Sequence, residues 1–232
     1  MEFIYDDNKS KCWYKDVCSH KDKCDGFCIR HYKMSYLTYM ALLSEKDKYP
    51  TALYPDADGT DLDIFNELKD ISRNIKSFVE EGKNLFLYSK TTGNGKTAWA
   101  KKLLLSYLNS IWASTDLTCR ALFIDMQVFF NKLRENISNK SDYLEHIQKY
   151  ILDADLVIWD EVSVKNITDW EHGYFLSYLN SRIDSGKANI FTSNICGEDL
   201  REKLGDRLYS RIVLTSRVIE FKGKDKRIIN KW

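Results

Sequence analysis

The stretch from Lys90 to Thr97 constrains this chain more than any other. It reads Lys-Thr-Thr-Gly-Asn-Gly-Lys-Thr and lies between an apolar run at 84–89 and a helical pattern at 98–111. In a strand, turn and helix of this kind, backbone N–H groups point at a bound anion and the helix dipole favours negative charge. Lys96 can reach the β and γ phosphates, and the Thr97 hydroxyl can bind Mg²⁺. The sequence therefore predicts that a nucleoside triphosphate is held by Thr92, Gly93, Asn94, Gly95, Lys96 and Thr97.

One position departs from the usual phosphate-loop pattern, because Lys90 stands where the first glycine is expected. A lysine there either crowds the turn or adds a phosphate contact, and the sequence does not decide between them. The alternative interpretation of the stretch is a Gly-Asn-Gly hairpin. A hairpin requires a second strand, whereas the residues that follow have helical spacing. The context therefore favours phosphate binding.

Size and composition exclude several classes of protein. The chain has 232 residues, of which 44% are hydrophobic, so it can bury a substantial core. No window approaches the roughly 18 apolar residues of a membrane span, and the first residues lack the features of a signal peptide. We therefore expect a cytoplasmic protein without a membrane partner. The net charge of +1 means that any nucleic-acid surface is a local patch.

The chain divides into two units of unequal size. Both prolines, Pro50 and Pro55, fall in a polar segment rich in turn-forming residues, which we interpret as a linker over 46–60. A cysteine-rich unit over 1–45 precedes it, and a larger unit over 61–232 follows. In the larger unit, apolar runs predict strands at 84–89, 120–125, 155–160, 188–193 and 217–221, separated mostly by helical stretches. This alternation predicts an α/β fold with a five-stranded, mainly parallel sheet.

The third predicted strand ends in two adjacent acids, Asp160 and Glu161. Asp160 can bind Mg²⁺ together with Thr97, and Glu161 can orient and polarise the water that attacks the γ-phosphate. Strands also end in ordinary acidic turns, so the pair alone is ambiguous. The upstream phosphate loop favours the catalytic interpretation, because ligands of parallel sheets bind where the strands end.

Two further polar segments follow. Asn194 closes the fourth predicted strand and can sit between the γ-phosphate and Glu161; the alternative is that it builds a turn with Gly197 and caps the next helix. Farther on, Arg207 and Arg211 are four residues apart and share one helix face. From spacing alone, a salt bridge from Arg207 to Glu202 or Asp206 is the simpler interpretation.

In this order and spacing, the segments KTTGNGKT, VIWDE, FTSN and LGDRLYSR resemble the AAA+ ATPase core of the DnaC/DnaI-type helicase loaders, over about residues 62–232. The resemblance implies binding of ATP or ADP with Mg²⁺ and slow hydrolysis that assembly, DNA or a partner stimulates. It implies three partners: a hexameric replicative helicase of the DnaB type, single-stranded DNA, and further copies of the chain joined through composite ATP sites. It makes Arg207 the candidate trans-acting arginine. The family also has an arginine shortly after the last strand, and Arg227 occupies a similar position in this sequence. Because few residues follow the last strand, the C-terminal lid is expected to be reduced or absent.

Four cysteines lie close together near the start of the chain: Cys12, Cys18, Cys24 and Cys28. Closely spaced thiols in a cytosolic chain suit tetrahedral Zn²⁺ better than disulfides. The spacing lacks tight C-x2-C pairs, so an iron–sulfur cluster, disulfides or free thiols remain alternatives. His31 can replace one cysteine as a ligand, although a single histidine in a basic run is more often exposed. DnaI-type loaders similarly have a small zinc-bearing amino-terminal module that contacts the helicase.

We therefore predict an ATP-dependent loader that places a replicative helicase on single-stranded DNA, with residues 1–45 as its partner-binding arm. A transposition helper ATPase (IstB-like) shares the core motifs and is the nearest alternative. A nonhydrolytic adaptor switched by ATP is a second alternative, which the presence of Glu161 disfavours. A nucleoside or nucleotide kinase is a further alternative, but the Asp-Glu strand end, Asn194 and the Gly-Asp-Arg segment together do not suit it.

Overall fold

A five-stranded parallel sheet lies at the centre of the computed structural model, which describes residues 3–6, 12–16, 18–48, 53–135, 141–164 and 167–226. The strands are β1 (Asn84–Tyr88), β2 (Ala121–Asp125), β3 (Leu156–Asp160), β4 (Ala188–Ser193) and β5 (Ser216–Glu220). Their order is β2-β3-β4-β1-β5, and every neighbouring pair is parallel. The predicted strands and the predicted parallel sheet are confirmed.

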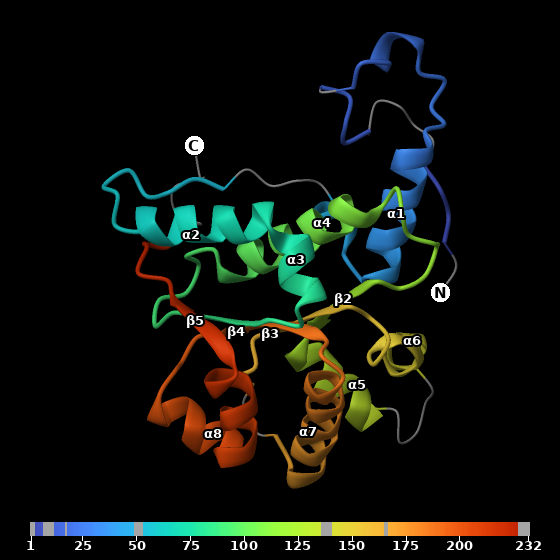
Figure 1. The fold of residues 1–232 in the computed structure, drawn as a ribbon. Helices are drawn as coiled ribbons and strands as arrows, with labels where there is room; N and C mark the ends of the chain where they lie inside the picture. Colours follow the sequence, from blue (N-terminus) through green and yellow to red (C-terminus); the bar gives the residue numbers. More distant parts are fainter. Residues whose placement is uncertain are drawn as a thin grey trace.

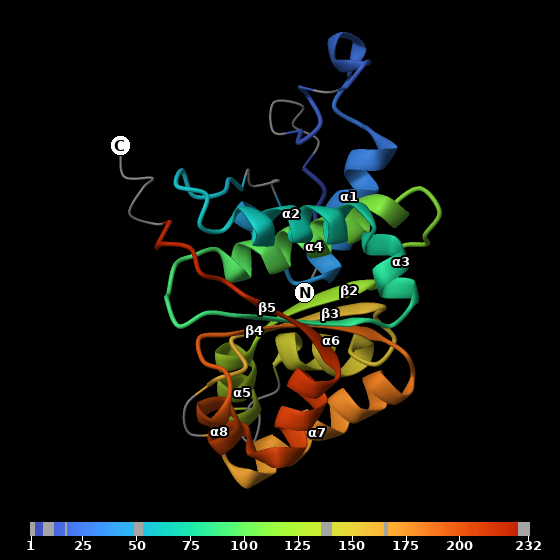
Figure 2. The same cartoon turned by 60° about the vertical axis from the view of Figure 1, so that its left-hand side comes forward.

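Helices cover both faces of the sheet (Figures 1 and 2). One face carries α1 (Ile29–Met40), α2 (Leu62–Arg73), α3 (Ile75–Glu80) and α4 (Lys96–Ile111). The other carries α5 (Met126–Glu135), α6 (Asp142–Tyr150), α7 (Asp169–Asp184) and α8 (Glu198–Tyr209). Short helical turns η2 (Lys21–Lys23), η3 (Glu45–Asp47) and the π-helical η4 (Ser210–Leu214) complete the described elements. Because both faces are covered, the inner strands are almost fully buried and read as continuous apolar runs.

Helix α1 packs into the core of the larger unit, although it belongs to the segment that we assigned to a separate arm. Met34 and Leu37 are buried in the same cluster as the sheet and α4. The backbone N–H of Phe123 in β2 donates to the carbonyl oxygen of Ala41 at 2.9 Å. From Ile29 onward, the first segment therefore shares its hydrophobic core with the larger unit.

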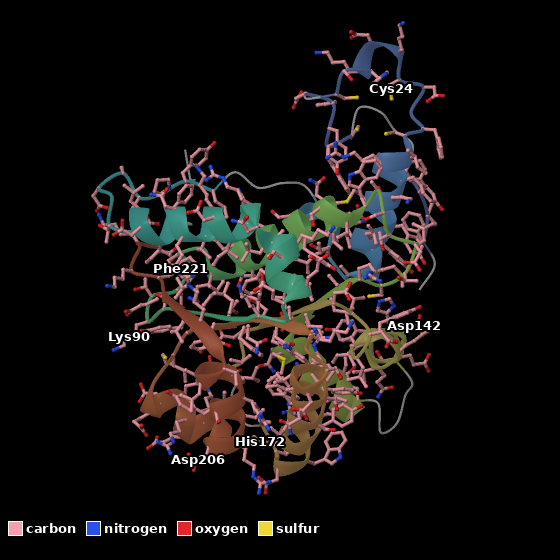
Figure 3. All side chains as sticks on the ribbon, in the orientation of Figure 1. Cys24, Lys90, Asp142, His172, Asp206 and Phe221 are labelled. Carbon is pink, nitrogen blue, oxygen red and sulfur yellow. The ribbon has the colours of Figure 1, made fainter. Side chains whose placement is uncertain are left out.

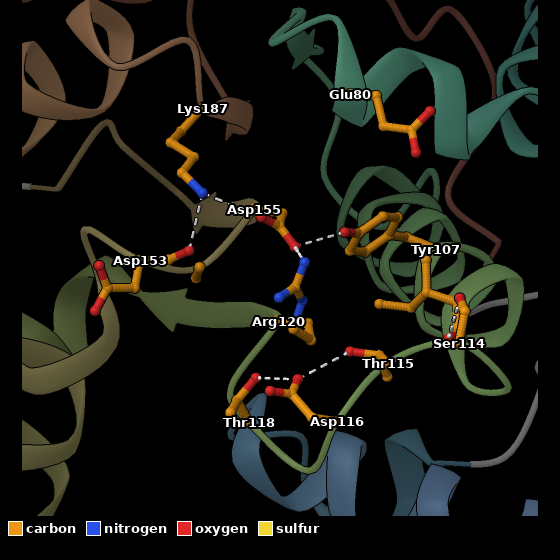
Figure 4. A network of polar contacts seen from close by, with 12 residues as sticks. Glu80, Tyr107, Ser114, Thr115, Asp116, Thr118, Arg120, Asp153, Asp155 and Lys187 are labelled. Atoms are coloured by element: carbon orange, nitrogen blue, oxygen red, sulfur yellow. Dashed lines mark hydrogen bonds and ion pairs between the residues drawn. The ribbon is translucent and has the colours of Figure 1, made fainter.

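Polar contacts fix the amino ends of the strands (Figure 4). Asp155, just before β3, accepts a hydrogen bond from the Tyr107 hydroxyl at 2.8 Å and forms ion pairs with Arg120 and Lys187. Burial and the bond to Asp155 raise the pKa of Tyr107. Nearby, the fully buried Arg182 donates to three backbone carbonyl groups and to an asparagine side chain. These contacts join α4, α7, β2, β3 and β4 at the edge opposite the phosphate loop.

Residues 221–226 follow β5 without forming a helix, and residues beyond 226 lie outside the described part of the chain. The reduced or absent lid therefore stays a prediction. Among the described helices, none has the length and hydrophobicity that a membrane span requires.

Candidate nucleotide-binding site

The phosphate loop has the expected geometry, running from the end of β1 to the start of α4 at Lys96. Gly93 and Gly95 have φ angles of 76° and 102°, a left-handed conformation that glycine adopts without strain. The side-chain cap of α4 is missing, because Gly95 stands at the N-cap. The amide groups of the first turn are therefore available to an anion, and the hairpin interpretation is wrong.

Lys90 neither crowds the turn nor strains it. Its φ angle is not in the positive region, so this position does not require glycine. The side chain is exposed and points away from the protein in Figure 3. The departure from the usual pattern therefore falls where the fold tolerates a side chain.

Lys96 lies over the loop itself. The residue is only 6% exposed, and its Nζ donates to the carbonyl oxygen of Thr91 and to Asn94 Oδ1, both at 3.3 Å. Asn94 is in turn buried and donates through Nδ2 to Ser89 Oγ. The ammonium group is thus held among oxygen acceptors of the loop, where phosphate oxygens can replace them.

Thr97 and Asp160 meet at the carboxyl end of β3. Thr97 Oγ1 donates to Asp160 Oδ1 at 2.9 Å, and Thr192 Oγ1 donates to the same oxygen at 2.7 Å. Burial raises the pKa of the Asp160 carboxyl, and these bonds together with the charge of Lys101 only partly oppose it. A hydroxyl and a carboxylate are the oxygen ligands that Mg²⁺ prefers. The donor set therefore fits the predicted metal.

Glu161 and Asn194 are in direct contact. Asn194 Nδ2 donates to Glu161 Oε2, and the Asn194 backbone N–H donates to Glu161 Oε1 at 3.4 Å. Glu161 has a φ of 58°, an uncommon value for a non-glycine residue that often marks functional sites. Its backbone N–H donates to Thr192 Oγ1 at 2.8 Å. The structure thus brings the four predicted residues Thr97, Asp160, Glu161 and Asn194 together.

Thr192, which was not among the predicted site residues, joins the two acids: its hydroxyl donates to Asp160 and accepts from the Glu161 backbone N–H. Ser163, whose hydroxyl donates to Glu161 Oε1, was not predicted either. The available signal was the position of Thr192 beside Asn194 at the tip of a strand. A hydroxyl residue in a buried strand also reads simply as a good strand former, so the signal was weak.

The candidate arginines lie elsewhere. Arg207 is exposed on α8, beyond a kink at Gly205, and its side chain makes no hydrogen bond or ion pair with the described residues. Asp206 instead pairs with Arg201 at 2.6 Å, so the expected salt bridge to Arg207 is not formed. Arg207 is not joined to the site of its own chain, and its trans role stays a prediction. Arg227 lies outside the described residues.

The cysteines are not arranged as a metal centre. Cys12, Cys18, Cys24 and Cys28 are all described, half-buried and free of disulfides. Within the described ranges, no three or more His, Cys, Asp or Glu side chains are grouped so that they can hold a metal ion. As they are placed, these residues do not fit Zn²⁺, and the predicted zinc-binding domain is not supported.

His31, expected to be exposed or a zinc ligand, is 6% exposed. Its Nδ1 is hydrogen-bonded to the Tyr5 hydroxyl at 2.9 Å, and its ring contacts Trp13 and Tyr5. Burial lowers its pKa. The expectation of an exposed histidine is therefore wrong, because aromatic residues from the start of the chain cover α1 at this point.

No protein-family model and no curated protein sequence matches the chain. Solved structures do match. The DnaC helicase loader aligns with 73% of this chain and 94% of its own length, at 19% identity and a TM-score of 0.58. DnaI aligns with 82% of this chain and 93% of its own length, at 18% identity and a TM-score of 0.57.

The chain has the fold of the DnaC/DnaI helicase loaders. The resemblance seen in the four sequence motifs is thus confirmed at the level of the fold, a parallel α/β sheet with helices on both faces. The replication initiator DnaA bound to AMPPCP and single-stranded DNA also has this fold: it aligns with 79% of this chain and 52% of its own length, at 18% identity and a TM-score of 0.55. In the DnaC/DnaI-like chain described here, the phosphate loop and the acidic tip of β3 occupy the carboxyl edge of the sheet, where α/β proteins bind their ligands.

Proposed function

We propose that this protein is an ATP-dependent loader that places a hexameric replicative helicase of the DnaB type on single-stranded DNA at replication initiation, in the cytoplasm. The observation that carries the proposal is the hydrogen-bonded chain from Thr97 through Asp160 and Thr192 to Glu161 and Asn194. This chain of contacts joins the phosphate loop to Glu161, the carboxylate proposed to activate water, in one site. The shared fold of the DnaC and DnaI loaders supports the same role.

In this proposal each residue of the site has one task. The loop amides and the Lys96 ammonium bind the β and γ phosphates, and Asp160 with the Thr97 hydroxyl holds Mg²⁺. The metal ion would supply charge neutralisation on the phosphate oxygens. Glu161 accepts a hydrogen bond from the attacking water and polarises it. Asn194 fixes the Glu161 carboxylate and changes partner when a γ-phosphate is present.

Hydrolysis in the isolated chain is expected to be slow, because Arg207, the candidate trans-acting arginine, is not joined to the site of its own chain. We propose that Arg207 of a neighbouring copy completes the site and stabilises charge in the transition state. Its exposed position on α8, without an intramolecular ion pair among the described residues, supports an intermolecular role. Self-association through composite sites then links ATP turnover to assembly.

The deciding experiment is size-exclusion chromatography with light scattering on this protein mixed with its cognate replicative helicase, with and without ATP. We expect a stable complex that ATP modulates. A variant without residues 1–25 tests the arm more cleanly than removal of 1–45, because α1 is part of the core. Loss of the complex in this variant would assign helicase binding to the arm.

Two results would replace the proposal. DNA-dependent self-assembly without any helicase complex would favour a transposition helper ATPase. A helicase complex that requires ATP but is unchanged by Glu161→Gln, in a protein without ATPase activity under any condition, would favour a nonhydrolytic adaptor.

Metal analysis tests the binding of zinc that the cysteine spacing predicted and that the placement of the described thiols does not support. The spacing predicts stoichiometric zinc after anaerobic purification and its loss in Cys24→Ser. Wild-type protein purified without metal would agree with the placement of the thiols in the structure, which does not form a metal site among the described residues. Neither result changes the assignment of the nucleotide site, because Cys24 lies far from Lys90, the first residue of the phosphate loop (Figure 3).

A further inference from the structure

The chain that follows β5 returns to the phosphate loop. We call residues 221–226 the clamp segment. At its start, the carbonyl oxygen of Phe221 accepts a hydrogen bond from Ser89 Oγ at 2.7 Å and from Asn94 Nδ2 at 3.4 Å. Ser89 and Asn94 flank the turn of the loop, so this contact fixes the base of the loop.

At its end, the clamp segment holds the tip of the loop. The backbone N–H of Lys226 donates to the carbonyl oxygen of Gly93 at 3.0 Å. The Lys226 side chain is anchored at the same time: Nζ donates to Asp61 Oδ2 at 2.6 Å and to the carbonyl oxygen of Tyr54 at 2.8 Å, and it lies 3.4 Å from Asp56 Oδ1. One residue thus connects the phosphate loop to the segment before α2.

The two acids that anchor Lys226 are themselves fixed. The side chains of Asp56 and Asp61 are 5% and 7% exposed. The backbone N–H of Asp56 donates to Asp61 Oδ1 at 2.6 Å, and that of Lys224 donates to Asp56 Oδ2 at 2.9 Å. A Cβ atom on Gly223 would lie 2.8 Å from Asp56 Oδ2, so glycine permits this close approach.

A second ion pair on the clamp segment provides the contrast. Lys224 Nζ lies 2.6 Å from Asp58 Oδ2, but the two side chains are 72% and 43% exposed. Exposed pairs of this kind contribute little to stability. The buried cluster of Lys226 is therefore expected to hold the clamp segment, and the exposed pair is not.

We propose that Lys226 is a positioning residue for the phosphate loop, and that Asp56 and Asp61 hold it in place. The inference rests on the proposed nucleotide-binding function and extends it. Lys226 needs no contact with nucleotide: its side chain fixes the clamp segment, and its backbone N–H fixes the Gly93 carbonyl. A loop held in its binding conformation loses less conformational entropy when the phosphates bind.

The proposal gives the segment before α2 a role that the sequence did not suggest. We interpreted residues 46–60 as a linker, yet Tyr54 and Asp56 hold the clamp segment. Any displacement of this segment, which precedes α2 and follows η3, would be transmitted to the loop. Nucleotide affinity is thereby coupled to a part of the chain that lies outside the predicted motifs.

The test compares Lys226→Met with Lys224→Met in the full-length protein. Equilibrium titration with a fluorescent ATP analogue is expected to give about tenfold weaker binding for Lys226→Met, because a charged hydrogen-bond anchor is lost, and a change of less than about twofold for Lys224→Met. Amide hydrogen exchange over residues 90–97 should be faster in Lys226→Met alone. Lys226→Arg, which keeps the cation, should restore affinity to within about threefold of wild type.

Gly223→Ala provides an independent variant, because it displaces the Asp56 carboxylate and leaves every charge in place. It is expected to weaken ATP binding as Lys226→Met does. Equal affinity and equal loop exchange in Lys226→Met and Lys224→Met would overturn the proposal, while leaving nucleotide binding intact. Absence of binding by the wild-type protein would instead overturn the proposed function, and the exchange comparison would still decide the role of Lys226.

Discussion

Strand β3 has an aspartate at each end, and the two have opposite surroundings. Asp155, before the strand, is paired with two cations, Arg120 and Lys187, and accepts a bond from Tyr107 (Figure 4). Asp160, the last residue of the strand, accepts bonds from two threonine hydroxyls and has no ion pair in the described part of the chain. Both side chains are half-buried, so burial alone does not explain the difference.

We interpret Asp155 as a structural acid and propose that Asp160 is a functional one. Protein side chains neutralise the charge of Asp155, and its contacts join helix α4 to the amino ends of three strands. The Asp160 carboxylate forms no ion pair with any cation among the residues that the structure describes, and burial raises the pKa of its carboxyl. A divalent cation would supply the missing charge. We infer that the neutralising partner of Asp160 is Mg²⁺, in agreement with the proposed function.

Replacing Asp160 with Asn should have the largest effect on activity. The variant keeps the shape of the side chain and removes the charge that binds the metal ion. We expect ATP hydrolysis to fall by about a hundredfold or more, because the metal contributes several kcal/mol to the transition state. Steady-state phosphate release in the presence of helicase and DNA measures this. Retention of more than about a third of the activity would contradict the assignment of Asp160.

The same variant should remove a pH dependence of stability. Since the pKa of Asp160 is raised in the folded protein, its contribution to stability without metal is full below the unfolded pKa of about 4 and is lost as pH rises through the folded value. Metal-free Asp160→Asn should therefore gain stability relative to wild type as pH rises above about 4. Thermal unfolding in EDTA across pH 4–7 measures the difference. If the melting temperatures of the two proteins changed in parallel with pH, another group of the protein would already neutralise the Asp160 carboxylate.

Replacing Asp155 with Asn should reverse the pattern. It leaves Arg120 and Lys187 without their counter-charge, so we expect the free energy of unfolding to fall by about 2 kcal/mol, less than for a fully buried pair because the site is partly exposed. The affinity of the folded protein for an ATP analogue should stay within about twofold of wild type, because no contact reaches the loop. Urea denaturation and nucleotide titration measure the two quantities. Weaker nucleotide binding with unchanged stability would invalidate the comparison.

Sequence was a good guide where the signal is local. The strands were predictable because buried parallel strands are continuous apolar runs. The phosphate loop was predictable because its conformation depends on glycines at fixed positions, as the φ angles of Gly93 and Gly95 show. The contact between Glu161 and Asn194 followed from a general rule, since parallel strands end at one edge of a sheet.

Sequence was a poor guide where distant segments meet. The bond between Lys226 and Gly93 joins residues that are far apart in the chain, and neither residue belongs to a pattern that predicts the other. The burial of His31 depends on Tyr5 and Trp13, which no helical or strand period relates to it. The separate arm was predicted from proline and cysteine positions, which carry no information about the packing of α1 on the sheet.

Thr192→Val should produce an intermediate effect. Valine has the shape of threonine without its hydroxyl, so Asp160 loses a donor and the Glu161 backbone N–H loses an acceptor. We expect ATP hydrolysis to fall by about tenfold, with stability reduced by about 1 kcal/mol. Thr192→Ser, which keeps the hydroxyl, serves as the matched control and should retain most of the activity. Equal losses in both variants would indicate that the methyl group and its packing matter more than the hydroxyl.

Lys90→Gly should have the smallest effect, although it restores the usual phosphate-loop pattern. The φ angle at this position is not in the region that favours glycine, and the side chain is exposed. Glycine there also increases the conformational freedom of the unfolded chain, which costs stability. We expect ATP affinity within about twofold of wild type and a loss of less than about 1 kcal/mol in unfolding free energy. A large gain in affinity would mean that the lysine side chain hinders the phosphates, so that the departure from the pattern weakens the site.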